Sequence, residues 1–158
     1  MRNTTKTSTF SAEEKSAMKE RAAEVKATAK GADGEAEVLG KIAAMAAEDR
    51  TIASKFHHMV REVAPELVPR TWYGMPAYAT PGKSGKVICF FQDAGKFKAR
   101  YATVGFSDTA ALDEGSMWAT TFAVLQWSAD NEKRLRALVT TAADSKRSHS
   151  TTDTARGR

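Results

Sequence analysis

Hydrophobic and polar residues alternate with helical periodicity through the first 65 positions of the chain. Three helices are expected, over 12–30, 35–48 and 52–63, with a Gly-rich break before the second and a short interruption at 49–51 before the third. The second and third helices have apolar residues along one face, and Pro65 ends the third. The apolar stripes are Val38, Ile42 and Met45 on the second helix, and Ile52, Phe56, Val60 and Val63 on the third.

The first helix differs from the other two in the bulk of its apolar face. Ser11 and Glu14 have the spacing of a capping box, which predicts that the helix begins after Ser11. Its apolar positions have helical spacing but small side chains, so we expect this helix to dock weakly or to project from the domain. These positions are Met18, Ala22, Val25 and Ala29.

The second half of the chain has the pattern of an antiparallel meander, and most of the aromatic residues lie in it. Strands are expected over 76–80, 87–91, 97–106 and 118–127, with a short helix over 108–112. The run 87–91 is continuously apolar, which is typical of a strand covered on both faces. The segment 97–106 alternates between apolar and polar positions, as a half-buried strand does.

A final helix is expected after Ser128 or Asp130, because either side chain can cap it. The sequence therefore predicts an α+β fold, with an antiparallel meander of about four to five strands packed with N-terminal helices and a C-terminal helix. The expected boundaries are a disordered N-terminal tail at 1–10, a helical extension at 11–32, an α+β domain at 35–145 and a disordered basic tail at 146–158.

The net charge of +5 is confined to the two ends of the chain. Residues 1–9 carry +2 and residues 146–158 carry +3, whereas residues 10–145 have 18 basic and 18 acidic side chains. A folded nucleic-acid-binding domain concentrates positive charge on the domain itself. We therefore expect no specific nucleic-acid partner.

Composition narrows the class of protein further. No apolar run approaches the roughly 18–20 residues of a membrane helix, and the first residues lack the apolar segment of a secretory signal. Cys89 is the only cysteine, so an internal disulfide and a Cys-rich metal site are excluded. We expect a soluble cytoplasmic protein with no membrane partner.

Motifs for catalysis are weak. Gly82-Lys83-Ser84 lacks the earlier glycine of a phosphate loop and precedes a strand, so it is interpreted as a turn. His57 and His58 are adjacent on a helix and point about 100° apart, which disfavours a shared metal, and we expect one to be packed and the other exposed. Cys89 lies in the most apolar strand, so we expect a buried, inert thiol. The chain is not expected to be an enzyme.

The densest cluster of unusual residues is the segment 71–78. Gly74 permits a positive φ, and Pro76 holds the preceding residue in an extended conformation. This aromatic corner is either a purely structural turn or one wall of a pocket. Under the second alternative, the predicted ligand-binding residues are Trp72, Tyr73, Tyr78, Arg100 and Trp118, and four of them, all except Tyr73, are expected to surround one concavity.

The same corner, with the segments that follow it, resembles the YdhG-like family, a domain of unknown function. The resemblance rests on WYGMPAY at 72–78, GKVICFF at 85–91, KFKARYATVGF at 96–106 and ALDEGSMW at 111–118, and it extends over roughly 35–145. It implies an α+β domain. Some members of that family are described as intracellular iron chaperones with a frataxin-like fold, which implies iron as a possible ligand held by acidic surface residues. No residue-level iron motif carries over to this chain.

Two functional hypotheses follow. The first is a non-catalytic binding or carrier protein for iron or a small ligand, bound at the aromatic corner or at an acidic face. The second is a protein-interaction module that has no small-molecule ligand. The sequence leaves the metal ligands, the identity of the ligand and the oligomeric state open.

Overall fold

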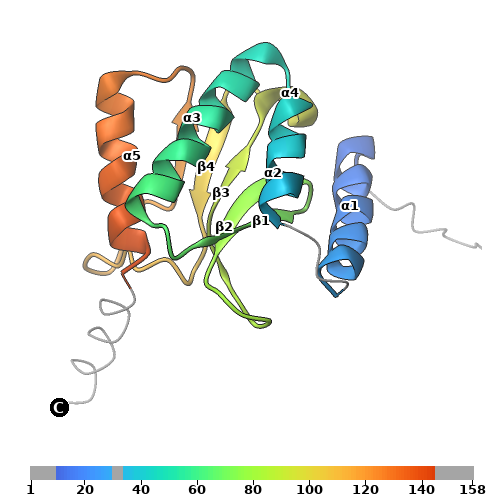
Figure 1. Cartoon of the computed structure of the whole chain (residues 1–158). Coiled ribbons are helices and arrows are strands. Elements are labelled where there is room, and N and C mark those ends of the chain that lie inside the picture. The colour runs from blue at the N-terminus through green and yellow to red at the C-terminus, as the bar shows by residue number, and fades with distance from the viewer. Residues whose placement is uncertain (1–9, 30–33, 145–158) are drawn as a thin grey trace, which may run out of the picture.

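The structure, a computed structural model, describes residues 10–29 and 34–144. Within these residues the chain forms five helices and one five-stranded antiparallel sheet in the order β1-β2-β3-β4-β5 (Figure 1), which confirms the predicted α+β meander. The helices are α1 (Ala12–Ala29), α2 (Gly34–Ala43), α3 (Ala47–Val63), α4 (Ala94–Phe97) and α5 (Ala129–Ala142). The strands are β1 (Val68–Trp72), β2 (Met75–Ala79), β3 (Val87–Gln92), β4 (Ala102–Phe106) and β5 (Thr121–Val124). The two predicted tails lie outside the described residues, apart from Phe10.

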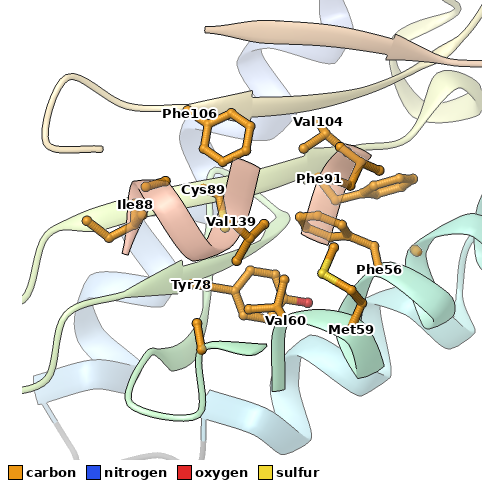
Figure 2. Packing of buried hydrophobic residues seen from close by; sticks show 14 of the residues in the cluster. Phe56, Met59, Val60, Tyr78, Ile88, Cys89, Phe91, Val104, Phe106 and Val139 are labelled. Carbon is orange, nitrogen blue, oxygen red and sulfur yellow. The ribbon is translucent and has the colours of Figure 1, made fainter. Parts of the chain in front are cut away.

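Helices α2, α3 and α5 cover one face of the sheet, and α1 lies beside α2, next to the edge strand β1 (Figure 1). The core lies between the sheet and the three covering helices. Figure 2 shows Phe56 of α3 facing the sheet; its ring centroid lies 5.7 Å from that of Tyr78 and 6.2 Å from that of Phe91. All three rings are fully buried. Burial of this kind is the main favourable term in folding.

The apolar run on β3 has a different cause from the one that the sequence suggested. The register between β2 and β3 shifts next to Tyr78, which pairs with Cys89, while Ala79 pairs with Val87. Ile88 is thus the extra residue of a bulge, and both Ile88 and Cys89 belong to the core on the helix-covered face. Phe90 lies on the opposite face and is only partly buried. The strand is thus fully covered on the helix-facing side and only partly covered on the other, so the predicted coverage of both faces is found in part.

The first half of the chain departs from the prediction in one boundary and in one strand. The break between the second and third helices lies at 44–46 rather than at 49–51, so Asp49 lies in the first turn of α3, where a carboxylate is favourable. Its buried carboxylate accepts hydrogen bonds from the backbone N–H groups of Ala94 (3.2 Å) and Gly95 (3.0 Å). The strand β1 was also missed, because Pro69 disfavours a central strand but is tolerated on an edge.

Two further predictions fail between residues 93 and 127. The segment between the predicted strands 87–91 and 97–106 contains the helical turn α4, which Asp93 caps. Lys98 has a left-handed backbone (φ 52°), so β4 begins only at Ala102 rather than at 97. The predicted helix over 108–112 is absent from the described structure, and residues 107–120 form an irregular loop before the short strand β5. The hydroxyls of Ser107 and Thr109 both donate to the carbonyl of Val87. These two hydrogen bonds attach the start of the loop to β3.

Candidate functional site

The aromatic corner is a two-residue hairpin turn between β1 and β2. Trp72 pairs with Met75, and the two residues between them both have positive φ, 52° at Tyr73 and 76° at Gly74. Positive φ at both central positions is typical of the type I′ turn that suits a twisted hairpin. The predicted conformation of Gly74 is confirmed, and the turn leaves two successive backbone N–H groups without partners in the sheet ladder.

A carboxylate from α1 accepts hydrogen bonds from these two N–H groups. Glu24 Oε2 lies 2.9 Å from the nitrogen of Tyr73, and Glu24 Oε1 lies 2.7 Å from the nitrogen of Gly74. The Glu24 side chain is only 7% exposed, and Arg21 lies 3.7 Å from the same carboxylate and 5.7 Å from the centroid of the Tyr73 ring. A charged acceptor with two backbone donors makes a strong, directional contact.

A second carboxylate of α1 lies one turn earlier and directly over the corner. Glu20 Oε2 lies 2.5 Å from Lys96 Nζ and 3.7 Å from Lys41 Nζ. A Cβ atom at Gly74 would collide with both the Glu20 carboxylate and the Lys96 ammonium group. The corner thus requires glycine at 74 for its backbone conformation and for the close approach of α1.

The structure brings together only two of the predicted ligand-binding residues. The rings of Trp72 and Tyr73 lie 5.0 Å apart, and Trp72 also contacts Phe90, on the sheet face that α2, α3 and α5 leave uncovered. Tyr78 belongs to the opposite face, where it is fully buried against Phe56. Successive side chains of β2 point to opposite faces of the sheet. Met75 lies on the same face as its partner Trp72, so Tyr78, three positions further along the strand, lies on the other face.

Arg100 and Trp118 lie elsewhere. Arg100 is exposed in the segment between α4 and β4, with its guanidinium 5.4 Å from the centroid of the Tyr101 ring. Trp118 is 38% exposed and lies in the loop that precedes β5. The cavity that Trp118 lines, described in the next paragraph, is lined by none of the other predicted residues. The prediction that Trp72, Tyr78, Arg100 and Trp118 surround one concavity is wrong.

Trp118 lines a cavity of about 370 Å³ formed by the loop 107–120. The first half of this loop is fixed to the domain by three buried residues, 110–112, and by a hydrogen bond from the nitrogen of Ala111 to the carbonyl of Ala142 (3.0 Å). The second half is exposed, and Met117 is 88% exposed. The lining residues are Ser107, Asp108, Ala110, Leu112, Asp113, Ser116, Met117, Trp118 and Thr120.

A polar network inside the core was not foreseen from the sequence. His57 Nδ1 lies 2.9 Å from the hydroxyl of Tyr78, and His57 Nε2 lies 3.2 Å from Glu35 Oε1. Because a carboxylate only accepts, Nε2 carries the proton and donates it to Glu35, so Nδ1 accepts from the Tyr78 hydroxyl. The network joins α2, α3 and β2. Its only sequence signal was that position 57 borders the apolar stripe of the third helix.

Burial sets the protonation of this network. Burial lowers the pKa of His57, although the hydrogen bond to Glu35 opposes that shift, and burial raises the pKa of Tyr78 well above its ordinary value. His58 is exposed, which confirms that one histidine of the pair is packed and the other is not. Cys89 is fully buried as predicted, and burial raises the pKa of its thiol.

The described residues contain no group of three or more His, Cys, Asp or Glu side chains that could hold a metal ion. Every helix in the described part of the chain is too short or too polar to cross a bilayer. No model of a known protein family matches the chain. Curated proteins give no match, and neither do solved structures. The resemblance to the YdhG-like family, and the iron ligand that it implies, therefore stay predictions.

Proposed function

We propose that this chain is a non-catalytic binding protein whose small-molecule ligand occupies the cavity of the loop 107–120. The observation that carries the proposal is the cavity itself, about 370 Å³ and lined by the Trp118 side chain. Ligand sites of proteins have volumes in the range of about 300–1,000 Å³ and combine apolar walls with a few polar groups. This cavity has that combination.

The loop has the character of a functional segment. Connections of more than about 12 residues without secondary structure are uncommon in compact domains and are usually functional. Residues 107–120 form such a connection, with a buried first half that fixes the backbone and an exposed second half that contains Met117 and Trp118. An exposed Met and Trp side by side provide apolar contact area for a ligand.

The charge of the lining selects the class of ligand. Among the described residues that line the cavity are two carboxylates, of Asp108 and Asp113, and no lysine or arginine. Carboxylates form charge-assisted hydrogen bonds with ammonium groups, and the face of an indole ring attracts cations. We therefore propose a small organic cation with an apolar body as the ligand. Arg100, the one cationic side chain among the predicted ligand-binding residues, does not line this cavity.

The binding is proposed to be non-catalytic. His57 and Cys89, a potential base and a potential nucleophile, are both buried in the core. Neither of them lines the cavity.

Calorimetric titration with three small probes tests the proposal. 2-Phenylethylamine carries a cation, 3-phenylpropionate is its anionic counterpart of similar shape, and tetramethylammonium is a cation without the aromatic ring. We expect the amine to bind at least tenfold more tightly than the anion, and both Trp118→Ala and Asp108→Asn/Asp113→Asn to weaken it at least fivefold. Trp127→Phe is the matched control, because Trp127 packs against the core and not in the cavity.

Two results would contradict the proposal. Equal binding of the amine and the anion would show that the carboxylates do not select the ligand. Amine binding that is unchanged in Trp118→Ala would show that the ligand does not occupy this cavity. Iron is the alternative ligand that the family resemblance implies, so Fe²⁺ is titrated in parallel under anaerobic conditions. Tight binding of Fe²⁺ together with no binding of any organic cation would favour the iron carrier instead.

A further inference from the structure

The described side chains of α1, those of residues 12–24, add little to the apolar core. Ala17 is the buried apolar side chain among them, and the core cluster between the sheet and the covering helices contains none of them. Among the side chains of α1 that the structure describes, Ala17 and Glu24 are the buried ones, and Met18 is 43% exposed. Helices normally dock in proteins by burying an apolar face. The attachment of this described part of α1 therefore depends mainly on polar interactions.

Among the described residues, the polar contacts that attach α1 are mainly those of carboxylates with cations and with backbone N–H groups. Glu24 accepts from the backbone nitrogens of Tyr73 and Gly74, and Glu20, one turn earlier, pairs with Lys41 and Lys96. At the start of α1, Glu13 lies 2.8 Å from Lys98 Nζ. The hydrogen bond from Lys98 lowers the pKa of Glu13. The ion pairs of Glu13 and Glu20 are screened by salt, whereas the buried contact of Glu24 with the two backbone N–H groups is directional.

The rest of the domain presents a matching set of donors. We define the carboxylate-binding corner as the backbone N–H groups of Tyr73 and Gly74 together with the ammonium groups of Lys41 and Lys96. The two N–H groups are directed outward by the rigid hairpin turn, and the two lysines come from α2 and α4. Four donors from three separate elements thus converge on two carboxylates of one helix.

We infer that the carboxylate-binding corner is a docking site for an acidic helix of a partner protein, and that α1 occupies this site in the free chain. The recognised feature is a pair of carboxylates four residues apart, as Glu20 and Glu24 are in α1. The charge complementarity with Lys41 and Lys96 carries the choice of an acidic partner, and the paired N–H groups require an acceptor rather than a donor. The inference is independent of the cavity at Trp118.

A tethered helix competes strongly with any partner. A segment joined by a short linker has an effective concentration on the order of millimolar, so a partner helix must exceed that level to displace α1 from the wild-type chain. Weakening the contacts of α1 therefore exposes the site. The full-length Glu20→Gln/Glu24→Gln variant does this, because both side chains keep their size but lose their charge.

The probe is a fluorescent synthetic peptide of residues 11–29, and the readout is its anisotropy when protein is added. We expect the peptide to bind the Glu20→Gln/Glu24→Gln protein at least tenfold more tightly than the wild-type protein, and to lose this binding as salt is raised from 50 to 500 mM. A peptide with both glutamates changed to glutamine should bind at least tenfold more weakly. A peptide with Glu14→Gln is the matched control and should bind normally, because Glu14 is exposed on α1.

A second measurement leaves the docking contacts intact. Ala22 is exposed on α1 and Cys89 is fully buried, so a dye attaches selectively to the Ala22→Cys protein. Millimolar unlabelled peptide should lower the anisotropy of this dye, because α1 is displaced. The peptide with both glutamates replaced should leave it unchanged.

Three outcomes would overturn the inference. The first is no peptide binding to a Glu20→Gln/Glu24→Gln protein whose circular dichroism shows that it is folded. The second is binding that is indifferent to the two glutamates of the peptide. The third is dimerisation of the wild-type chain at rising concentration that the Glu20→Gln/Glu24→Gln variant does not show. The occupant of the corner would then be α1 of a second copy.

Discussion

Replacing Tyr78 by phenylalanine removes one hydroxyl from the centre of the core and leaves the ring in place. The ring keeps its contact with Phe56, at 5.7 Å between centroids, so little packing is lost. His57 Nδ1, however, loses the donor that lies 2.9 Å away and stays in a side chain that is 3% exposed. A buried acceptor left without a partner costs roughly 1–3 kcal/mol. We expect the free energy of unfolding to fall by about that amount.

Urea unfolding at pH 7.5, followed by circular dichroism, measures the loss. Tyr73→Phe is the matched control, because its ring is 38% exposed, and it should change stability by less than about 0.5 kcal/mol. The double variant His57→Leu/Tyr78→Phe removes both partners, and we expect it to be more stable than the sum of the two single changes predicts. A Tyr78→Phe protein as stable as wild type would refute the assignment of a structural hydrogen bond at this position.

Three other predictions follow from the same contacts. Gly74→Ala should destabilise the protein by about 1–2 kcal/mol from the positive φ alone. The loss should exceed that of Gly82→Ala, because Gly82 also has a positive φ but has open space around it. Equal losses in urea unfolding would contradict the close contact between Gly74 and α1. Cys89 should react with a water-soluble thiol reagent only after unfolding, because the thiol is fully buried and burial raises its pKa, and rapid labelling of the native protein would contradict its place in the core. Burial lowers the pKa of His57 below its ordinary 6.5, so the unfolded chain binds more protons between the folded pKa and 6.5. The contribution of His57 to stability is therefore complete above pH 6.5 and is lost as the pH falls through that window, with a slope of at most about 1.4 kcal/mol per pH unit. A His57→Gln protein whose stability has the same pH profile would contradict this assignment to His57.

Periodic apolar residues allowed much of the fold to be predicted. The stripe of the third helix and the Ser128 cap of the last helix are found in the structure as expected, with Ser128 Oγ accepting from the nitrogen of Asn131 at 3.1 Å. Patterns of this kind indicate from the spacing of apolar residues which side of a helix or strand is buried, so they can be recognised in a single sequence. The strand β1 and the turn α4 depend instead on tertiary contacts. Asp49 is an example, since its carboxylate binds the start of α4, 45 residues away in sequence.

The candidate site shows the same division. The sequence located the corner within 71–78 and predicted that Gly74 can adopt a positive φ, because Gly permits and Pro restricts particular backbone conformations locally. It missed Glu20 and Glu24, which look like ordinary residues of a solvated helix face. It also placed Trp72 and Tyr78 together, although the hairpin register puts them on opposite faces of the sheet. Register and helix docking are set by distant residues, which the local pattern does not contain.

The most direct test of the proposed binding function is an ¹H–¹⁵N correlation spectrum of the protein during titration with 2-phenylethylamine. The chain has three tryptophans, at 72, 118 and 127, so three indole N–H signals report on three separate regions. Binding in the loop cavity predicts that the indole signal of Trp118 and the backbone signals of 107–120 shift, while the indole signals of Trp72 and Trp127 stay in place. Shifts centred on Trp72, or no shift of Trp118 at millimolar amine, would contradict the account.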